Sequence, residues 1–338
     1  MSRPITVRRG PDFARFVGVG HYRPQRVVTN DEICTMMDSS DQWIRERSGI
    51  IERRWAATDE SVVDMAAIAG ANALAAAGVD ASDVGTVLCA TVTHPYQTPS
   101  AAVEIAERLG ARAAGSTDLS SACAGFAYGV GIADALIRTG TSEYVLVVGV
   151  EKLTDFVDPS DRSTGFIFAD AAGAAVIGPS DVAAIGPTLW GGDGTQTEAI
   201  ILDPDWVTHR KLIAAQIETP WPRLQMQGQA VFRWAVGDIP RVALAAVEAA
   251  GLTVDDLDVF IPHQANMRIT DSMVRTLKLP ERVVVARDIA TSGNTSGASI
   301  PLAMSRMLEA GEIESGQTAL LIGFGAGLSY AAQVVTIP

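Results

Sequence analysis

The chain has 338 residues, of which 48% are apolar and 19% charged, a composition that excludes a disordered protein and provides for a large buried core. Its formal net charge of −13 argues against a broad basic face for nucleic acid. Because the sequence lacks a long apolar run, a signal peptide and paired cysteine spacings, we expect a cytoplasmic protein that neither crosses a membrane nor depends on disulfides.

The first half of the chain predicts helices and strands in alternation. An alanine-rich helix begins near residue 66, and an AAG turn with acidic residues after it leads to a β-rich run that ends at Cys89. A helix over 99–110, a strand over 115–120, a helix from about Ala124 and a strand over 144–150 are predicted to follow.

The second half repeats this order. Residues 239–261 again predict a helix, an AAG turn with acidic residues and a strand, followed by a helix over 269–279, a strand over 283–289, a helix from about Ser299 and a strand over 319–325. Alternating strands and helices predict an α/β fold with mainly parallel sheets in two duplicated halves, residues 1–185 and 186–338. Residues 190–225 lack clear periodicity and are interpreted as an insertion that covers part of the second half.

Three polar residues are predicted to meet at one edge of these sheets. Cys123 and Asn294 lie between a strand and a helix in corresponding turns of the two repeats, and His263 follows the strand that ends at Pro262. Open α/β sheets bind ligands at the carboxyl ends of their strands, so we expect the active site there.

Each of these residues has two interpretations. Cys123 is either a packed core residue or a nucleophile whose pKa is lowered by a helix N-terminus, whereas Cys34 and Cys89 are expected in the core. His263 is a candidate base or oxyanion donor, with His94 as a weaker rival. Asn294 is either an oxyanion donor or a helix cap.

The glycine-rich segment GFGAG at 323–327 lacks the following helix that a dinucleotide-binding fingerprint requires. The backbone N–H of Ala326 is instead predicted to pair with that of Cys123 as an oxyanion hole. No set of side chains has metal-ligand spacing, so no metal site is expected. A cysteine, a histidine and an asparagine permit either papain-like hydrolysis or acyl transfer to carbon, and a duplicated α/β chain favours the second.

Four motifs resemble those of β-ketoacyl-acyl-carrier-protein synthase III, a condensing enzyme of the thiolase superfamily. They are SSACAGF at 120–126, IPHQANMRI at 261–269, SGNTSGASIP at 292–301 and GFGAG at 323–327, and the resemblance runs from about residue 17 to the end of the chain. It implies a thiolase-like fold of two αβαβα halves, with Cys123, His263 and Asn294 as the catalytic residues.

The resemblance also implies the reaction. Cys123 would take an acyl group from acyl-CoA, and malonyl-acyl-carrier-protein would then lose CO₂ and attack that group to give a 3-oxoacyl-acyl-carrier-protein, which starts fatty-acid synthesis. Acyl-CoA would be a substrate and no cofactor would be required. The expected partners are the carrier protein and a second copy of this chain.

Further residues are implied by matching motifs. The CoA-binding residues would be Trp43, Arg47, Arg162, Gly228 and Phe232, and a basic patch for the carrier protein would consist of Arg233, Arg268 and Arg275.

The sequence departs from the family pattern at four positions. Thr98 stands where many members have a phenylalanine that closes the acyl pocket from the partner subunit, which suggests room for larger starter groups. Ala169, Ala171 and Ala326 replace usual glycines. The alternatives left open are a homologue that primes a polyketide or other secondary-metabolite pathway, and a cysteine-dependent acyltransferase or thioesterase that forms no carbon–carbon bond.

Overall fold

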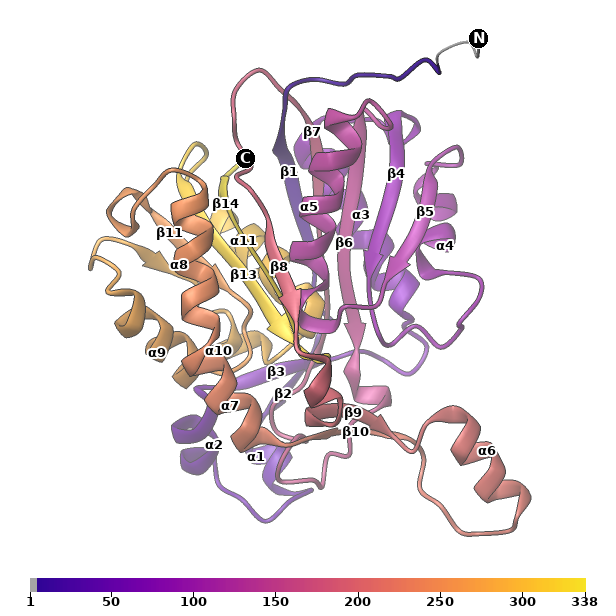
Figure 1. Cartoon of the computed structure of the whole chain (residues 1–338). Helices are drawn as coiled ribbons and strands as arrows, with labels where there is room; N and C mark the ends of the chain where they lie inside the picture. The colour runs from indigo at the N-terminus through magenta and orange to yellow at the C-terminus, as the bar shows by residue number, and fades with distance from the viewer. Residues whose placement is uncertain (1–4) are drawn as a thin grey trace.

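The computed structural model describes residues 5–338, which form two five-stranded sheets with one common strand order (Figure 1). The first sheet contains, from edge to edge, β1 (Phe13–Tyr22), β7 (Asp170–Ser180), β6 (Tyr144–Lys152), β4 (Val84–Ala90) and β5 (Gly115–Leu119). The second contains β8 (Leu189–Gly192), β14 (Ser329–Thr336), β13 (Thr318–Gly325), β11 (Val259–Pro262) and β12 (Val284–Val285).

The two sheets also agree in strand direction. In the first, β5, β4 and β6 are parallel neighbours, while β7 is antiparallel to both β6 and β1. In the second, β12, β11 and β13 are parallel neighbours, while β14 is antiparallel to both β13 and β8. Four of the five strands in each sheet therefore point one way, which confirms the duplicated α/β fold with mainly parallel sheets.

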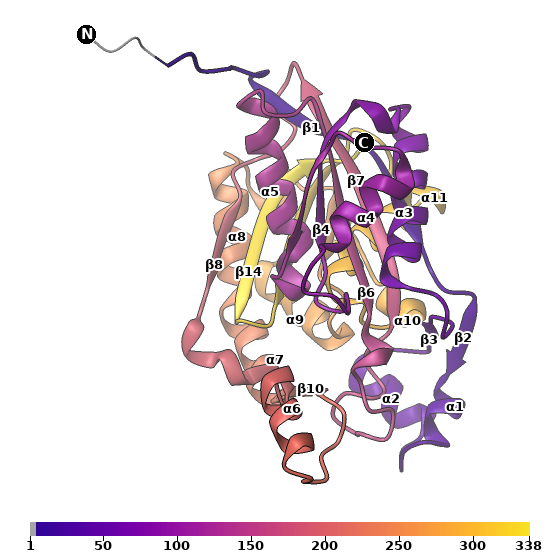
Figure 2. The same ribbon diagram turned by 90° about the vertical axis from the view of Figure 1, so that its right-hand side faces the viewer.

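Six helices complete the layers (Figures 1 and 2). The outer helices are α3 (Val62–Ala77) and α4 (Ala101–Leu109) on the first sheet and α8 (Ile239–Ala249) and α9 (Met267–Leu277) on the second. Between the sheets lie α5 (Gly125–Arg138) and α11 (Ser299–Glu309), whose apolar residues pack with both sheets in one core. This gives the expected αβαβα layers, because each sheet buries one face on the shared helices and one on its own pair.

Local signals explain where these helices begin and end. A capping box between Ser61 and Asp64 starts α3, and Gly78 in the left-handed conformation ends it. α5 and α11 each follow a short 3₁₀ turn, Ala122–Ala124 and Ser296–Ala298 respectively. The two turns occupy equivalent places in the two halves, so Cys123 in the first turn corresponds to Gly297 in the second. Asn294 lies three residues before Gly297.

The segment interpreted as an aperiodic insertion is instead ordered. It contains β9 (Ile200–Asp203) paired with β10 (Arg223–Met226), and α6 (Trp206–Ala214) between them projects from the body of the molecule (Figure 1). Leu224 donates a backbone hydrogen bond to Phe156 O at 2.7 Å, so this hairpin lies against the first half and does not merely cover the second. Strands of four residues are too short for a periodic pattern to reveal them.

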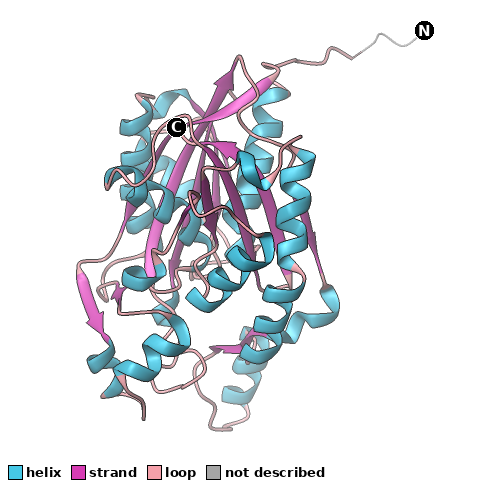
Figure 3. Ribbon diagram, turned by 90° about the vertical axis from the view of Figure 1, so that its left-hand side faces the viewer, coloured by secondary structure: helices cyan, strands magenta, loops and turns pink. Residues whose placement is uncertain are grey.

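Figure 3 shows the helices and strands of the whole chain in different colours, including those outside these layers. The remaining elements are β2 (Arg26–Thr29), α1 (Asn30–Cys34), α2 (Asp41–Ser48), β3 (Glu52–Trp55), α7 (Gly228–Gly237), α10 (Ile289–Ser292) and 3₁₀ turns at Ala81–Asp83, Leu153–Asp155, Gly194–Ala199 and Val254–Asp256. No helix within residues 5–338 is long and apolar enough to cross a bilayer. The division of the two halves at residue 185 stays a prediction. Residues 1–4 of the first predicted half lie outside the described part of the chain.

Candidate active site

A cavity of about 750 Å³ opens at the carboxyl ends of the parallel strands. Eleven of the thirteen residues predicted to contact substrate or carrier protein line it: Trp43, Arg47, Cys123, Arg162, Gly228, Phe232, Arg233, His263, Arg268, Asn294 and Ala326. These residues come from both halves of the chain. The duplicated fold therefore brings the predicted site together at the interface of its two sheets.

Cys123 lies in the 3₁₀ turn that leads into α5, at the inner part of the cavity. Its thiol donates a hydrogen bond to Ser296 Oγ across a distance of 3.4 Å. The other two cysteines are unpaired and do not line the cavity; Cys89 is fully buried and Cys34 packs in an apolar cluster. Both agree with the expectation that they are core residues.

The ionisation of Cys123 differs from the expectation. Burial raises the pKa of the thiol to about 12; the hydrogen bond to Ser296 lowers that pKa and the charge of Glu151 raises it. Desolvation of the thiolate is the largest of these effects, and its direction is opposite to the lowering predicted from a helix N-terminus. The resting sulfur is a thiol, and its attack on an acyl group requires a proton acceptor.

His263 enters the cavity from the end of β11. Its backbone N–H donates to Ile322 O at 2.7 Å, and its ring lies edge-on to Phe324 with centroids 5.3 Å apart. Burial lowers the pKa of His263 to about 3, so the ring is neutral. Nδ1 is 2.7 Å from Ser299 Oγ, which also accepts the N–H of Gln264 at 3.3 Å. Ser299 can therefore donate its proton to Nδ1, which leaves Nε2 as the protonated nitrogen.

Asn294 is fixed by both its backbone and its amide. The backbone of Asn294 exchanges hydrogen bonds of 2.9 Å with Ile167 O and Ala169 N. Its Oδ1 accepts the N–H of Ser296 at 2.8 Å. The acceptor end of the amide is thus occupied, and the Nδ2 hydrogens are the groups left for a ligand. A neutral histidine and an asparagine side chain both present donors, an arrangement suited to a developing oxyanion.

The glycine-rich turn after β13 touches Cys123 directly. A Cβ at Gly325 would lie 2.7 Å from Cys123 Cβ and 2.9 Å from its Sγ, so only glycine fits. Ala326, the next residue, lines the cavity beside them. The oxyanion hole predicted for the N–H groups of Cys123 and Ala326 stays a prediction.

Two of the alanines that replace usual glycines point away from the cavity. Ala169 is fully buried, and a Cβ on Gly293 would lie only 2.8 Å from the Ala169 methyl. Gly293, with φ of +70°, thus accommodates this extra methyl group. Ala171 packs with Ala298 and Leu302. Neither replacement narrows the cavity.

The mouth of the cavity combines an aromatic ring with arginines. Trp43 lies in the first turn of α2, whose cap Ser40 accepts its N–H at 3.2 Å. The guanidinium carbons of Arg162 and Arg47 lie 5.0 Å and 5.7 Å from the Trp43 ring centroid. On the opposite wall, Arg268 lies 5.3 Å from the Phe232 ring. Such cation–π pairs present a flat ring and positive charge to an incoming ligand.

Two of the predicted site residues, and the rival histidine, lie outside this cavity. Thr98 is exposed on the loop before α4 and does not line the cavity of its own chain. Arg275 is exposed on α9 beyond the mouth. His94, the weaker rival of His263, lies outside the cavity, 3.9 Å from Glu104.

The sequence analysis missed two polar residues next to Cys123. Ser296 lines the cavity, and Glu151 lies fully buried behind it. A charged residue directly after the apolar run VLVVGV was a signal for Glu151 that periodicity alone does not use. Within residues 5–338, no group of three or more histidine, cysteine or carboxylate side chains is arranged to hold a metal ion.

Comparisons with known proteins agree with one another. Profiles described as 3-oxoacyl-[acyl-carrier-protein] synthase III and its C-terminal region match residues 117–194 and 247–337. The chain is 55% identical to β-ketoacyl-[acyl-carrier-protein] synthase III 1 of Streptomyces coelicolor, with 99% of each chain covered.

Solved structures give the same result. The priming β-ketosynthase from the R1128 polyketide biosynthetic pathway superimposes with a TM-score of 0.96 at 46% identity, with 99% of each chain covered. The 3-oxoacyl-[acyl-carrier-protein] synthase III of Aquifex aeolicus gives a TM-score of 0.87 at 33% identity, covering 96% of this chain and 100% of that one.

Proposed function

The chain belongs to the 3-oxoacyl-[acyl-carrier-protein] synthase III family of condensing acyltransferases, and on this premise we propose that Cys123 carries the acyl group between acyl-CoA and malonyl-acyl-carrier-protein. The observation that carries the proposal is the meeting of Cys123, His263 and Asn294 in one cavity. The nucleophile comes from the first half and the two donors from the second.

In the first step, the Cys123 sulfur attacks the thioester carbonyl of acyl-CoA. The thiol proton passes to a proton acceptor beside the sulfur as the S–acyl bond forms. The C–S bond to CoA breaks, CoA leaves as a thiolate that takes a proton from water, and the acyl group stays on Cys123. The contacts of Trp43 with Arg47 and Arg162 support a site for the adenine ring at the mouth, with the pantetheine arm passing Gly228 and Phe232.

In the second step, malonyl-acyl-carrier-protein loses CO₂. Nε2–H of His263 and Nδ2–H of Asn294 donate to its thioester oxygen and stabilise the enolate that forms. The enolate carbon attacks the acyl group on Cys123, and the cysteine leaves as a thiolate. Neutral donors suit this role because they lose no proton to the enolate. The two substrates supply every atom of the product, and Cys123 is regenerated, so the proposed reaction requires no cofactor.

The carrier protein is expected at the basic residues around the mouth. Arg233 and Arg268 line the cavity and Arg275 continues along the exposed face of α9. This patch supports an acidic partner despite the net charge of −13.

A homodimer is the second expected assembly. β5 is the outer strand of the first sheet, and the loop before α4 exposes Val92 and Tyr96 by 44% and 63%. An open strand edge beside exposed apolar side chains supports pairing with a second copy. Thr98 lies in the same loop, where it would reach the acyl pocket of the partner.

Priming of a polyketide pathway is the second candidate function. The similarity to a priming β-ketosynthase of a polyketide pathway supports this candidate, and the small Thr98 side chain favours a starter group larger than acetyl. The two candidates share their chemistry and differ in the acyl group that Cys123 accepts.

One experiment tests the reaction and both alternatives. The protein is incubated with a panel of acyl-CoAs, and its intact mass reports acyl-enzyme before and after addition of [¹⁴C]malonyl-acyl-carrier-protein. We expect an adduct on Cys123, none in Cys123→Ala, and release of ¹⁴CO₂ with a 3-oxoacyl product. An adduct on Cys34 or Cys89, or acyl release without CO₂, contradicts the proposal. The preferred acyl-CoA distinguishes a fatty-acid starter from a specialised one.

A further inference from the structure

Glu151 is a buried carboxyl group to which the reaction above gives no role. It lies near the end of β6 with no exposed surface and does not line the cavity. Its carboxylate accepts hydrogen bonds from the Thr91 and Thr93 hydroxyls at 3.3 Å and 2.7 Å and from the Val92 N–H at 3.1 Å. A buried carboxylate is costly unless paired, and here three neutral groups from one loop hold it.

Ser296 connects this carboxyl group to the nucleophile. Its hydroxyl accepts the hydrogen bond of the Cys123 thiol at 3.4 Å and donates one to Glu151 Oε1 at 3.2 Å. The direction of both bonds runs from the sulfur towards the carboxylate. Glu151 does not line the cavity, and its hydrogen-bonded connection to Cys123 runs through this hydroxyl.

The backbone holds Ser296 in an uncommon conformation. Its φ is +50°, in the left-handed region that non-glycine residues seldom adopt, and Asn294 Oδ1 accepts its N–H. Ala122, beside Cys123, also has a positive φ, of +43°. Ser296 and the residue before Cys123 thus both have uncommon backbone conformations. Such conformations cluster at functional sites, where the surrounding structure imposes them.

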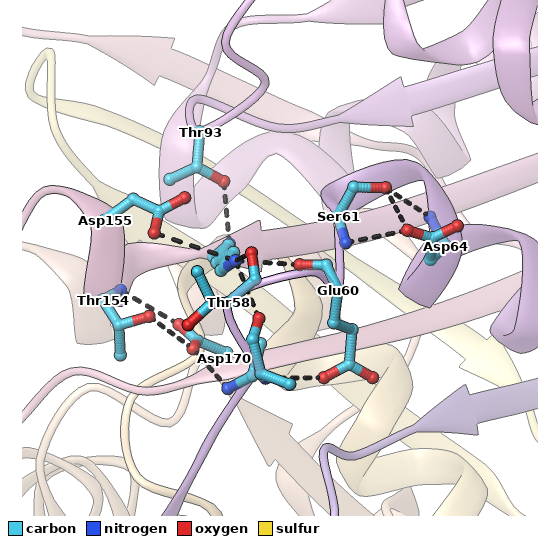
Figure 4. Close-up of polar contacts among 11 residues, drawn as sticks. Thr58, Glu60, Ser61, Asp64, Thr93, Thr154, Asp155 and Asp170 are labelled. Atoms are coloured by element: carbon cyan, nitrogen blue, oxygen red, sulfur yellow. Dashed lines mark hydrogen bonds and ion pairs between the residues drawn. The ribbon is translucent and has the colours of Figure 1, made fainter.

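The strand that carries Glu151 is anchored on its other side. Lys152 Nζ donates to the carbonyl groups of Ala57, Thr58 and Glu60 at 2.9–3.3 Å. Figure 4 shows Thr58, Glu60, Thr93 and Asp155 in this network of contacts; Asp155 Oδ1 lies 3.8 Å from Lys152 Nζ. Thr93 accepts the Lys152 N–H at 2.9 Å while it donates to Glu151. The carboxylate therefore has a fixed position.

The charged and titratable groups around Glu151 are few. Burial raises the pKa of Glu151 to about 7, against the lowering effect of its hydrogen bonds. Cys89 on β4 and Cys123 have thiol pKa values that the Glu151 charge raises further. Lys152 binds the loop at 57–60, and Asp170, opposite it on β7, binds Thr154 and Ala56.

We propose that Ser296 and Glu151 form a proton relay that takes the proton from the Cys123 thiol during acylation. The proposal deepens the function proposed above and rests on it. As the sulfur bonds to the acyl carbon, the thiol proton moves to Ser296 Oγ and the Ser296 proton moves to Glu151 Oε1. Ser296 touches the reacting sulfur, whereas Glu151 acts only through it.

The relay runs backwards in the second step. When the enolate attacks, the Cys123–acyl bond breaks and the sulfur leaves as a thiolate. Glu151 returns its proton through Ser296, which regenerates the thiol and the carboxylate. One proton is thus stored during each cycle, and the proton that CoA takes up comes from water.

Single-turnover acylation as a function of pH tests the relay. At saturating acyl-CoA, the wild-type rate is expected to rise with pH through an inflection near 7, because the relay needs Glu151 as the carboxylate. Ser296→Ala retains Cβ and removes the hydroxyl that links the Cys123 thiol to Glu151. We expect this variant and Glu151→Gln to acylate about 100-fold more slowly at pH 7 and to lose the inflection. Ser142→Ala, which removes the hydroxyl partner of Thr86 on the same sheet, should match the wild type.

The outcomes separate the two proposals. If Ser296→Ala folds and retains the wild-type rate and inflection, the relay is wrong, whatever the stability of Glu151→Gln. If wild-type protein forms no adduct on Cys123, the proposed function itself is wrong. A purely structural role for Glu151 lowers the yield of folded protein or the melting temperature but leaves the inflection of the folded fraction in place, and this also contradicts the relay.

Discussion

Among single residues, Ser299 is the hydrogen-bond partner of the His263 ring, with its hydroxyl 2.7 Å from Nδ1. A Ser299 hydroxyl that donates to Nδ1 leaves the proton on Nε2, which is the nitrogen proposed to meet the thioester oxygen. A ring with the other tautomer would present an acceptor to the thioester oxygen and would repel the enolate.

Ser299→Ala is therefore expected to slow condensation about 10-fold while acylation of Cys123 stays within a factor of two. The reason is that only the second step uses Nε2–H. Rapid-quench measurement of the two half-reactions separates them. Ser305→Ala, on the same helix and bonded to His21, is the matched control. Equal slowing of both steps contradicts this role of Ser299.

At the scale of secondary-structure elements, the active site depends on close approach of the β13 turn to the 3₁₀ turn before α5. Gly325 permits it because a Cβ there would overlap Cys123 Cβ and Sγ. The two turns come from different halves of the chain, so this contact joins the nucleophile to the second sheet.

We expect Gly325→Ala to reduce the acylation rate about 100-fold, since a displacement of the sulfur of about 1 Å costs that much. Intact-mass kinetics with acyl-CoA measure this loss. Gly237→Ala is the control, because a Cβ there meets no atom within 4 Å. Wild-type acylation by Gly325→Ala contradicts the proposed packing of the sulfur.

For the molecule as a whole, the basic patch of Arg233, Arg268 and Arg275 predicts an effect on carrier-protein binding, and the proposed dimer predicts an effect on acyl-group preference. Arg275→Glu is expected to raise KM for malonyl-acyl-carrier-protein about fivefold, the effect of ~1 kcal/mol from one surface charge, without changing acylation. The difference should shrink in high salt. Arg112→Glu, which reverses an exposed charge remote from the mouth, is the control. An equal rise in KM for this variant means that net charge alone is responsible and contradicts the proposed patch.

Thr98→Phe tests the reach of one subunit into the other. If Thr98 borders the partner's acyl pocket, the larger ring shifts the preference towards acetyl-CoA over longer acyl-CoAs by about 10-fold. Acyl-enzyme yields from mixed acyl-CoAs measure the shift, and sedimentation measures the mass of the assembly. A monomer, or an unchanged acyl preference, contradicts this placement.

Much of this site was predictable from the sequence because its local signals are strong. The duplicated order of helices and strands predicted both sheets, and strand ends placed Cys123, His263 and Asn294 at one edge. Short elements without periodicity, such as β9 and β10, were not predictable, because four residues are too few to show a pattern.

The alternation of elements, the duplication and the identity of the groups at the strand ends follow from the sequence, because side-chain periodicity and turn chemistry are local properties. The environment of those groups follows from the folded chain. The burial that raises the pKa of the Cys123 thiol, the contact of His263 with Ser299, and the approach of Ser296 and Glu151 to the sulfur all depend on residues far apart in the chain. Desolvation and hydrogen-bond partners arise from packing, and packing is fixed only when the two halves meet.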